Sequence, residues 1–166
     1  MATVSEVLAD PKEAARRWEA DPELPFVSSV RVAERTRRLV RLNIRFEPWP
    51  PMAAEGYPTE RVRLEIRSNG EVRVYPATRI FNRKWKHRYP NDGRLCLFYP
   101  GDPEALVWSL DDPLEDLLGI ISRHLQAEEF WRRHGRWPWE DAPHGAAASN
   151  GPQSTLMRRL AGLEVG

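Results

Sequence analysis

Apolar residues recur with a period of two between residues 26 and 75, and this period predicts strands that bury one face. The alternating positions fall into four groups: Val30 and Val32; Val40, Leu42, Ile44 and Phe46; Val62, Leu64 and Ile66; Val72 and Val74. Residues 35–38 form the first expected turn, and residues 47–58 form a Pro-rich loop. Ser68-Asn69-Gly70 is a typical hairpin sequence before the last group. We therefore expect an antiparallel meander with one solvated, arginine-rich face.

The segment before these strands has the signals of a helix. It is expected to begin at Asp10-Pro11, because aspartate is a common N-cap and proline suits the first helical position. Glu13 would complete a capping box. The helix should end at Asp21, since proline follows it.

A longer helix is expected after the strands. It should begin at Asp112-Pro113, with a capping box through Glu115, and Gly135 is a plausible C-cap. Its apolar residues have helical spacing, so one face should pack against the sheet: Leu114, Leu117, Leu118, Ile121 and Leu125. Residues 77–89 show no period and are expected to form a loop. Together these elements predict an α+β fold.

Composition limits the function classes. The chain has 166 residues, of which 41% are hydrophobic, with 25 Lys and Arg against 24 Asp and Glu. These values are typical of a globular domain, and near-neutral charge argues against nucleic-acid binding. No stretch approaches the roughly 20 apolar residues of a membrane span, and no secretory signal is visible, so we expect a cytoplasmic protein. Residues 145–154 are rich in Gly, Ala, Ser and Asn, which predicts a domain over 1–144 followed by a flexible linker and short tail over 145–166.

The single cysteine, Cys96, excludes an intramolecular disulfide and the zinc sites that use two or more thiolates. We expect neither a metal nor a cofactor. Cys96 lies in the segment His-Arg-Tyr-Pro-Asn-Asp-Gly-Arg-Leu-Cys-Leu, residues 87–97, and Trp108-Ser109 precedes the second helix. On its own, a lone cysteine in an apolar run is more often a buried small hydrophobic residue.

On these residues the chain resembles the ubiquitin-conjugating enzyme family, in which a His-Pro-Asn stretch precedes an Asn-Gly-x-[Ile/Leu]-Cys-Leu segment. The finer likeness is to the prokaryotic branch, where a Trp, Gly, Trp and His tail follows the helix. Here that tail is Trp131, Gly135, Trp137 and His144, and the likeness covers about residues 10–144. The resemblance implies a ubiquitin-conjugating-enzyme-like fold, with an N-terminal helix, a β-meander, a catalytic cysteine loop and C-terminal helices.

The resemblance also implies that Cys96 accepts the C-terminus of a partner protein as a thioester. Eukaryotic members place an asparagine eight residues before the cysteine, where this chain has Arg88. Asn91, His87 and Tyr89 are therefore the candidates for stabilising the oxyanion of the tetrahedral intermediate. By turn chemistry alone, residues 91–93 are equally well explained as a turn.

Partner surfaces follow from the same resemblance. Arg16 and Arg17 match the helix surface that meets an activating enzyme, although a solvated helix face explains them too. Trp108 is a further partner-binding candidate. Similar proteins occur in bacterial antiphage operons, so the implied partner is a cGAS-like nucleotidyltransferase of cyclic-oligonucleotide signalling or a bacterial ubiquitin-like modifier, with an activating enzyme as a further partner.

Two other function classes stay open. A cysteine hydrolase would pair Cys96 with His87 or His144, but the local signatures of papain-like and caspase-like nucleophiles are absent around Cys96. A non-catalytic scaffold would bind and stimulate a partner without needing the thiol of Cys96.

Overall fold

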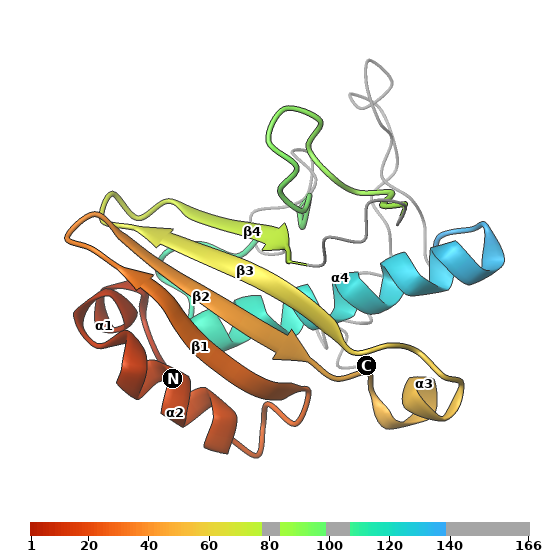
Figure 1. The fold of residues 1–166 in the computed structure, drawn as a ribbon, viewed down its shortest axis with the longest axis horizontal. Helices are drawn as coiled ribbons and strands as arrows, with labels where there is room; N and C mark the ends of the chain where they lie inside the picture. Colours follow the sequence, from red (N-terminus) through yellow and green to blue (C-terminus); the bar gives the residue numbers. More distant parts are fainter. Residues whose placement is uncertain (78–83, 99–106, 139–166) are drawn as a thin grey trace, which may run out of the picture.

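The computed structural model describes residues 1–77, 84–98 and 107–138. It contains a four-stranded antiparallel sheet in the order β1-β2-β3-β4 (Figure 1). The strands are β1 (Val27–Arg35), β2 (Leu39–Phe46), β3 (Glu60–Arg67) and β4 (Val72–Pro76). Each strand pairs with the next in the chain, as the predicted meander requires. The turn between β3 and β4 contains Gly70 at φ +85°, a backbone conformation that glycine adopts without a steric cost.

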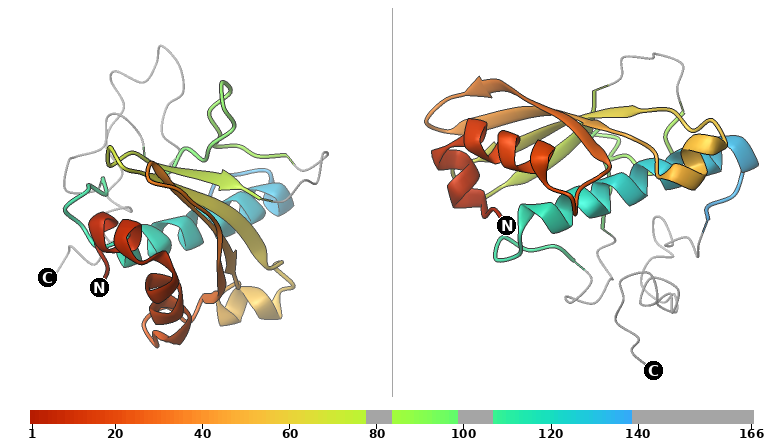
Figure 2. Two further views of the ribbon diagram at one scale, coloured as in Figure 1. Left: turned by 60° about the vertical axis from the view of Figure 1, so that its left-hand side comes forward. Right: turned by 90° about the horizontal axis from the view of Figure 1, so that it is seen from below.

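Helices cover one face of this sheet. They are α1 (Val4–Ala9), α2 (Pro11–Ala20) and α4 (Leu114–His134), while the short α3 (Pro50–Ala54) lies in the connection between β2 and β3. The right-hand view of Figure 2, which is seen from below, shows α2 and α4 on the same side of the strands. The predicted apolar face of α4 is buried together with the inward residues of the strands, so a single hydrophobic core joins both layers. The α+β class predicted from the sequence is therefore confirmed.

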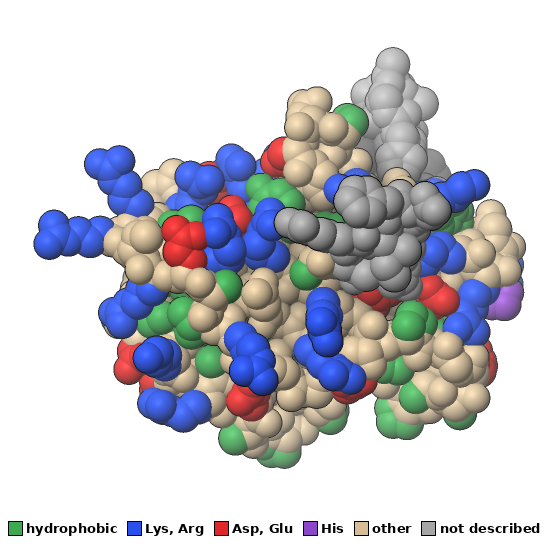
Figure 3. Space-filling view, in the orientation of Figure 1, with side chains coloured by type: hydrophobic (Ala, Val, Ile, Leu, Met, Phe, Trp, Pro, Cys, Tyr) green, Lys and Arg blue, Asp and Glu red, His purple; other side chains and the backbone are tan. Residues whose placement is uncertain are grey.

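The opposite face of the sheet carries the arginines, as predicted, and is lined by charged side chains (Figure 3). Several of these arginines have carboxylate partners on the same face. Arg41 and Arg63 both contact Glu65, with N–O distances of 2.9 and 3.1 Å. Glu65 is nearly enclosed by them, since its side chain is 7% exposed. The outer face is thus partly neutralised by its own acidic residues.

The N-cap predicted for α2 is confirmed, but its capping box is not, because the carboxylate of Glu13 pairs with Arg16 at 2.6 Å. The start of α4 differs from the prediction. Asp10 caps α2 by accepting the N–H of Glu13 at 3.1 Å. The N-cap of α4 is Pro113, which has no side-chain cap hydrogen bond, so the expected capping box there is wrong. The physical reason is a tertiary contact: both oxygens of Glu115 accept the backbone N–H of Ala2 at 2.8 Å.

Two helices were not expected from the sequence. Helix α1 has a complete capping box between Thr3 and Glu6, a signal that the sequence contains. Helix α3 begins with prolines inside the expected Pro-rich loop, and its N-cap, Trp49, makes no side-chain cap hydrogen bond. The predicted C-cap of α4 is confirmed, because Gly135 has φ +70°. The tail over 145–166 lies outside the described residues.

None of the helices in the described part of the chain has the length and apolar character that crossing a membrane demands.

Candidate active site

The residues before Cys96 form a tight hairpin. Arg88 and Leu95 pair as an isolated antiparallel bridge, and the N–H of Tyr89 donates to the carbonyl of Arg94 at 2.9 Å. At the turn, Gly93 has φ +73°, and a Cβ atom there would collide with the guanidinium of Arg88. Arg88 lies so close because its Nε donates to the carbonyl of Gly93 at 2.9 Å. The turn therefore favours glycine for its backbone conformation, whereas the flexible end of Arg88 could move away from an added side chain.

Two backbone hydrogen bonds fix Cys96 against the rest of the protein. The N–H of Leu95 donates to the carbonyl of Val74 in β4 at 2.7 Å. The N–H of Cys96 donates to the carbonyl of His87 at 3.1 Å. Since Leu95 belongs to the hydrophobic core, the cysteine follows a residue anchored to the sheet.

The thiol of Cys96 is half-buried and lies beside Tyr89. Its sulfur is 3.5 Å from the carbonyl oxygen of Phe98. Burial raises the pKa of Tyr89 above its ordinary value, and a hydrogen bond with Cys96 raises this pKa further. The tyrosine is therefore protonated at neutral pH and can donate a hydrogen bond. The guanidinium of Arg94 stacks on its ring, 4.2 Å from the centroid, and holds the ring in place.

A groove of about 120 Å³ is lined by Tyr89 and by the chain neighbours of Cys96, but not by Cys96 itself. The residues on either side of the cysteine, Leu95 and Leu97, both line it. Most of its other lining is apolar: Val72, Val74, Phe98, Trp108 and Leu117. The polar lining consists of Tyr89, Arg73 and Arg94. Trp108 is fixed there because its indole N–H donates to the carbonyl of Pro113 at 2.9 Å. The groove is comparable in size to a cavity of about 150 Å³ that binds benzene, so it can hold one apolar side chain.

His87 and Asn91, the other oxyanion candidates, have different positions. The ring of His87 is buried edge-on against Trp137, with a centroid distance of 4.3 Å. The backbone carbonyl of His87, rather than its ring, accepts a hydrogen bond from the N–H of Cys96. Asn91 is exposed in the hairpin turn, and its side chain makes no hydrogen bond to the described residues. Of the predicted residues, the structure therefore brings Tyr89 and Cys96 together.

A buried carboxylate beneath this segment was missed by the sequence analysis. Glu128 is 0% exposed, and its oxygens accept the N–H groups of His87 at 2.7 Å and Lys86 at 2.8 Å. Burial raises the pKa of Glu128, while these two hydrogen bonds act in the opposite direction. A signal for it exists in the sequence: a carboxylate three residues after Leu125 continues the apolar face of α4.

The buried His124 lies next to this carboxylate on α4. Its Nε2 is 3.7 Å from an oxygen of Glu128. Burial is the largest cause that lowers the pKa of His124 to about 3, and repulsion from His87 and Arg132 adds to it. His124 is therefore neutral at physiological pH and belongs to the packing beneath the site.

The predicted partner-binding residues are dispersed. Arg16 and Arg17 are exposed on α2, and Arg16 pairs with Glu13 at 2.6 Å. Trp108, by contrast, lines the groove beside Cys96. His144 of the tail motif lies outside the described residues.

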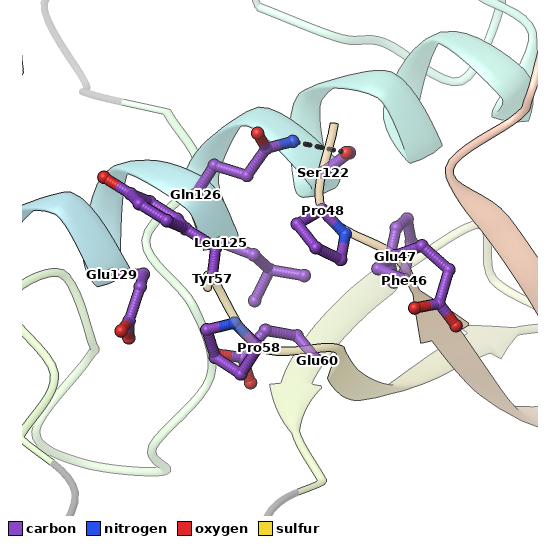
Figure 4. A pocket seen from close by; sticks show the side chains of 10 residues that line it. All are labelled: Phe46, Glu47, Pro48, Tyr57, Pro58, Glu60, Ser122, Leu125, Gln126 and Glu129. Atoms are coloured by element: carbon purple, nitrogen blue, oxygen red, sulfur yellow. Dashed lines mark hydrogen bonds between the residues drawn. The ribbon is translucent and has the colours of Figure 1, made fainter. Parts of the chain in front are cut away.

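A second, much smaller cavity lies between α4 and the connection from β2 to β3 (Figure 4). Its volume of about 10 Å³ is that of one water molecule. The amide of Gln126 points toward Ser122 there and donates to its hydroxyl at 3.2 Å. This cavity is too small for a substrate.

Comparison with known proteins does not identify a family for this chain, so its function has to be inferred from the site. No family model matches the sequence, and no curated protein matches it. Within the described residues, no group of three or more His, Cys, Asp or Glu side chains is arranged to hold a metal ion. What the site offers chemically is a half-buried thiol with a hydroxyl donor beside an apolar groove.

Proposed function

We propose that the protein is a cysteine-dependent transferase of the ubiquitin-conjugating type, which carries the C-terminus of a partner protein as a thioester on Cys96. The observation that carries the proposal is the placement of the half-buried Cys96. Its N–H donates to the carbonyl of His87, it follows a residue anchored to β4, and Tyr89 is a neighbour of its thiol. This pair lies beside an apolar groove, in the segment whose sequence resembles the family. The antiparallel sheet, N-terminal helices and long C-terminal helix are compatible with that family's fold.

The first chemical step loads the thiol. The thiolate of Cys96 attacks the carbonyl carbon of the partner's activated C-terminus, a sulfur–carbon bond forms, and the activating group leaves with its electron pair. In the second step an acceptor amine or hydroxyl attacks the thioester carbonyl. The sulfur–carbon bond then breaks, the thiolate leaves, and the proton of the acceptor passes to this thiolate or to water. In both steps the oxyanion and the sulfur carry negative charge, which a hydrogen bond from Tyr89 stabilises.

The groove supplies the place for the end of the donor chain. An apolar side chain near the partner's C-terminus would contact Leu97, Phe98 and Trp108. Filling the groove also displaces water from the neighbourhood of Cys96, which protects a thioester against hydrolysis.

The surroundings of Cys96 favour transfer over hydrolysis. A cysteine hydrolase needs a histidine within hydrogen-bond reach of its thiol. Among the described residues, the hydrogen bond of the Cys96 side chain goes to the carbonyl of Phe98 at 3.5 Å, and Tyr89 is its titratable neighbour. The ring of His87 packs against Trp137 and His124. In the part of the chain that the structure describes, no histidine ring is hydrogen-bonded to the thiol, so no imidazole there activates water against a thioester; His144 lies outside the described residues.

By sequence resemblance, the donor is the C-terminus of a cGAS-like nucleotidyltransferase in antiphage signalling. The alternative donor is a bacterial ubiquitin-like modifier, which would be loaded by an activating enzyme. In either case the resemblance implies that the carried group is a protein, and the groove of about 120 Å³ would receive a side chain near its C-terminus.

The test is to produce the chain together with the proteins encoded next to it and to analyse Cys96 by intact-mass spectrometry. We expect a partner-sized mass increase that dithiothreitol removes. Cys96→Ser should give an ester-linked adduct that resists the thiol, and Cys96→Ala should give none. Two results together would reject the transferase in favour of a scaffold. The wild type would form no adduct, and the Cys96→Ala variant would still bind its partner and stimulate the partner's activity.

A further inference from the structure

One side chain of α4 is connected through the backbone to the thiol of Cys96. Glu128 accepts hydrogen bonds from the N–H groups of His87 and Lys86, across 41 and 42 residues of sequence. The carbonyl of the same His87 accepts the N–H of Cys96 at 3.1 Å. A continuous path therefore runs from the helix, through one residue of the hairpin, to the cysteine.

The position of Glu128 is costly unless it has a specific use. A fully enclosed carboxylate loses its hydration and needs hydrogen bonds or charges to offset that loss. An apolar side chain at this position would simply continue the buried face formed by Ile121 and Leu125. The carboxylate adds two things that an apolar residue does not. It accepts hydrogen bonds from two neighbouring N–H groups, and it pairs with Arg132 on its own helix at 3.9 Å. Only the first of these connects α4 to the segment that contains Cys96.

We propose that Glu128 is a positioning residue, which fixes the backbone of His87 and thereby holds Cys96 against the Tyr89 hydroxyl. The inference rests on Cys96 being the reactive group of the proposed function. The reactivity of its thiol, however, can be measured without any partner protein. If no thioester formed but Glu128 still affected the reactivity of the thiol, the proposed function would be rejected and the positioning role would stand.

The experiment is a double-mutant cycle on the alkylation rate of Cys96. Iodoacetamide reports on this thiol alone, because the chain has no other cysteine. The variants are Glu128→Gln, Tyr89→Phe and the two combined. Glutamine keeps the size of Glu128, but its amide group replaces one acceptor with a donor, so one N–H loses its partner.

The expected result is a loss of coupling between Tyr89 and the thiol. Tyr89→Phe should slow alkylation at pH 7 about threefold in the wild type, because it removes a donor that stabilises the thiolate. In the Glu128→Gln background the same change should alter the rate by less than about 1.5-fold, because the thiol is no longer held at the hydroxyl. An equal effect of Tyr89→Phe in both backgrounds would overturn the proposal.

The matched control is Glu65→Gln. Glu65 is also a buried carboxylate with two partners, but these are Arg41 and Arg63 on the outer face of the sheet. Its loss should lower the melting temperature and leave the effect of Tyr89→Phe unchanged. A merely structural role of Glu128 predicts that both glutamine variants behave alike, which would count against positioning.

Hydrogen exchange on the wild type keeps the inference testable if Glu128→Gln does not fold. The amides of Lys86, His87 and Cys96 should have similar protection factors, after correction for their intrinsic exchange rates, because a single anchor holds all three. Exchange of the Cys96 amide well before the other two would show that Glu128 does not hold the cysteine and would overturn the proposal.

Discussion

The sheet and the segment around Cys96 are stabilised by different kinds of contact. All four strands pair with their sequence neighbours, and the inward side chains are almost completely enclosed in one core. The segment over 84–98, in contrast, has one isolated bridge, between Arg88 and Leu95. It is attached to Val74 of β4 by one hydrogen bond, and to α4 by two hydrogen bonds to Glu128 and one from Arg132 to the carbonyl of Lys84. The sheet thus depends on many similar apolar contacts, and the site on a few contacts with particular partners.

This difference determines how each region responds to change. Losing one of many apolar contacts weakens the whole domain, because the core unfolds as a unit. Losing one of the hydrogen bonds at the hairpin allows that segment to open while the sheet stays folded. A transferase benefits from this arrangement, since the neighbourhood of the thiol can admit a donor and an acceptor without unfolding the core.

The largest effect is expected from Leu64→Ala. Leu64 is completely buried in the central strand β3, and such truncations cost about 3 kcal/mol of unfolding free energy. Denaturant unfolding should show that loss, whereas the alkylation rate of Cys96 in the folded protein should not change. Leu110→Ala, at a 49% exposed position, is the control and should change neither quantity. An altered alkylation rate in the folded Leu64→Ala variant would mean that sheet and site are not separate in the way described.

A second effect comes from the packing under the site. The pKa of His124 is lowered from 6.5 to about 3, so below pH 6.5 the unfolded chain binds a proton there that the folded protein does not. Stability from this group is complete above pH 6.5 and is lost as the pH falls toward 3. Between pH 7 and 5 the wild type should therefore lose about 2 kcal/mol more than His124→Gln.

Denaturant unfolding at the two pH values measures this difference. Glu128 and His87 face His124, and both remain in the variant, so their own titration affects the two proteins similarly. His134→Gln, at an exposed position of the same helix, should lose stability with pH as the wild type does. Identical pH dependence of the wild type and His124→Gln would contradict the enclosed, neutral state of His124.

Sequence reasoning succeeded for the region whose contacts are periodic. The alternation from Val40 to Phe46 predicts β2 because burying every second residue needs no knowledge of the partner. The capping box assigned to Glu115 failed for the opposite reason. A carboxylate in the first turn can bind its own helix or a distant segment, and here Ala2 and Trp18 provide the donors.

The same limit applies to the site. The sequence around Cys96 drew attention to Tyr89, His87 and Asn91 together, because spacing alone cannot tell which side chain of a hairpin turns toward the thiol. The role of Glu128 depends on a contact 41 residues away. A carboxylate on an apolar helix face signals a buried partner, but the partner emerges only when α4 and the hairpin are placed in space.

The smallest expected effects come from two glycine substitutions, one in the hairpin before Cys96 and one in α4. Gly93→Ala places a side chain at φ +73° and against the guanidinium of Arg88, which should cost about 1 kcal/mol. It should also change the alkylation rate of Cys96, because the hairpin must shift. Gly119 lies within α4 with no atom within 4 Å of an added Cβ, so Gly119→Ala should raise stability by less than about 1 kcal/mol. Its alkylation rate should equal that of the wild type. Gly93→Ala could instead lower stability and leave the alkylation rate of Cys96 unchanged. The hairpin would then be an independent surface turn, and the conformation of residues 88–95 would not determine the position of Cys96.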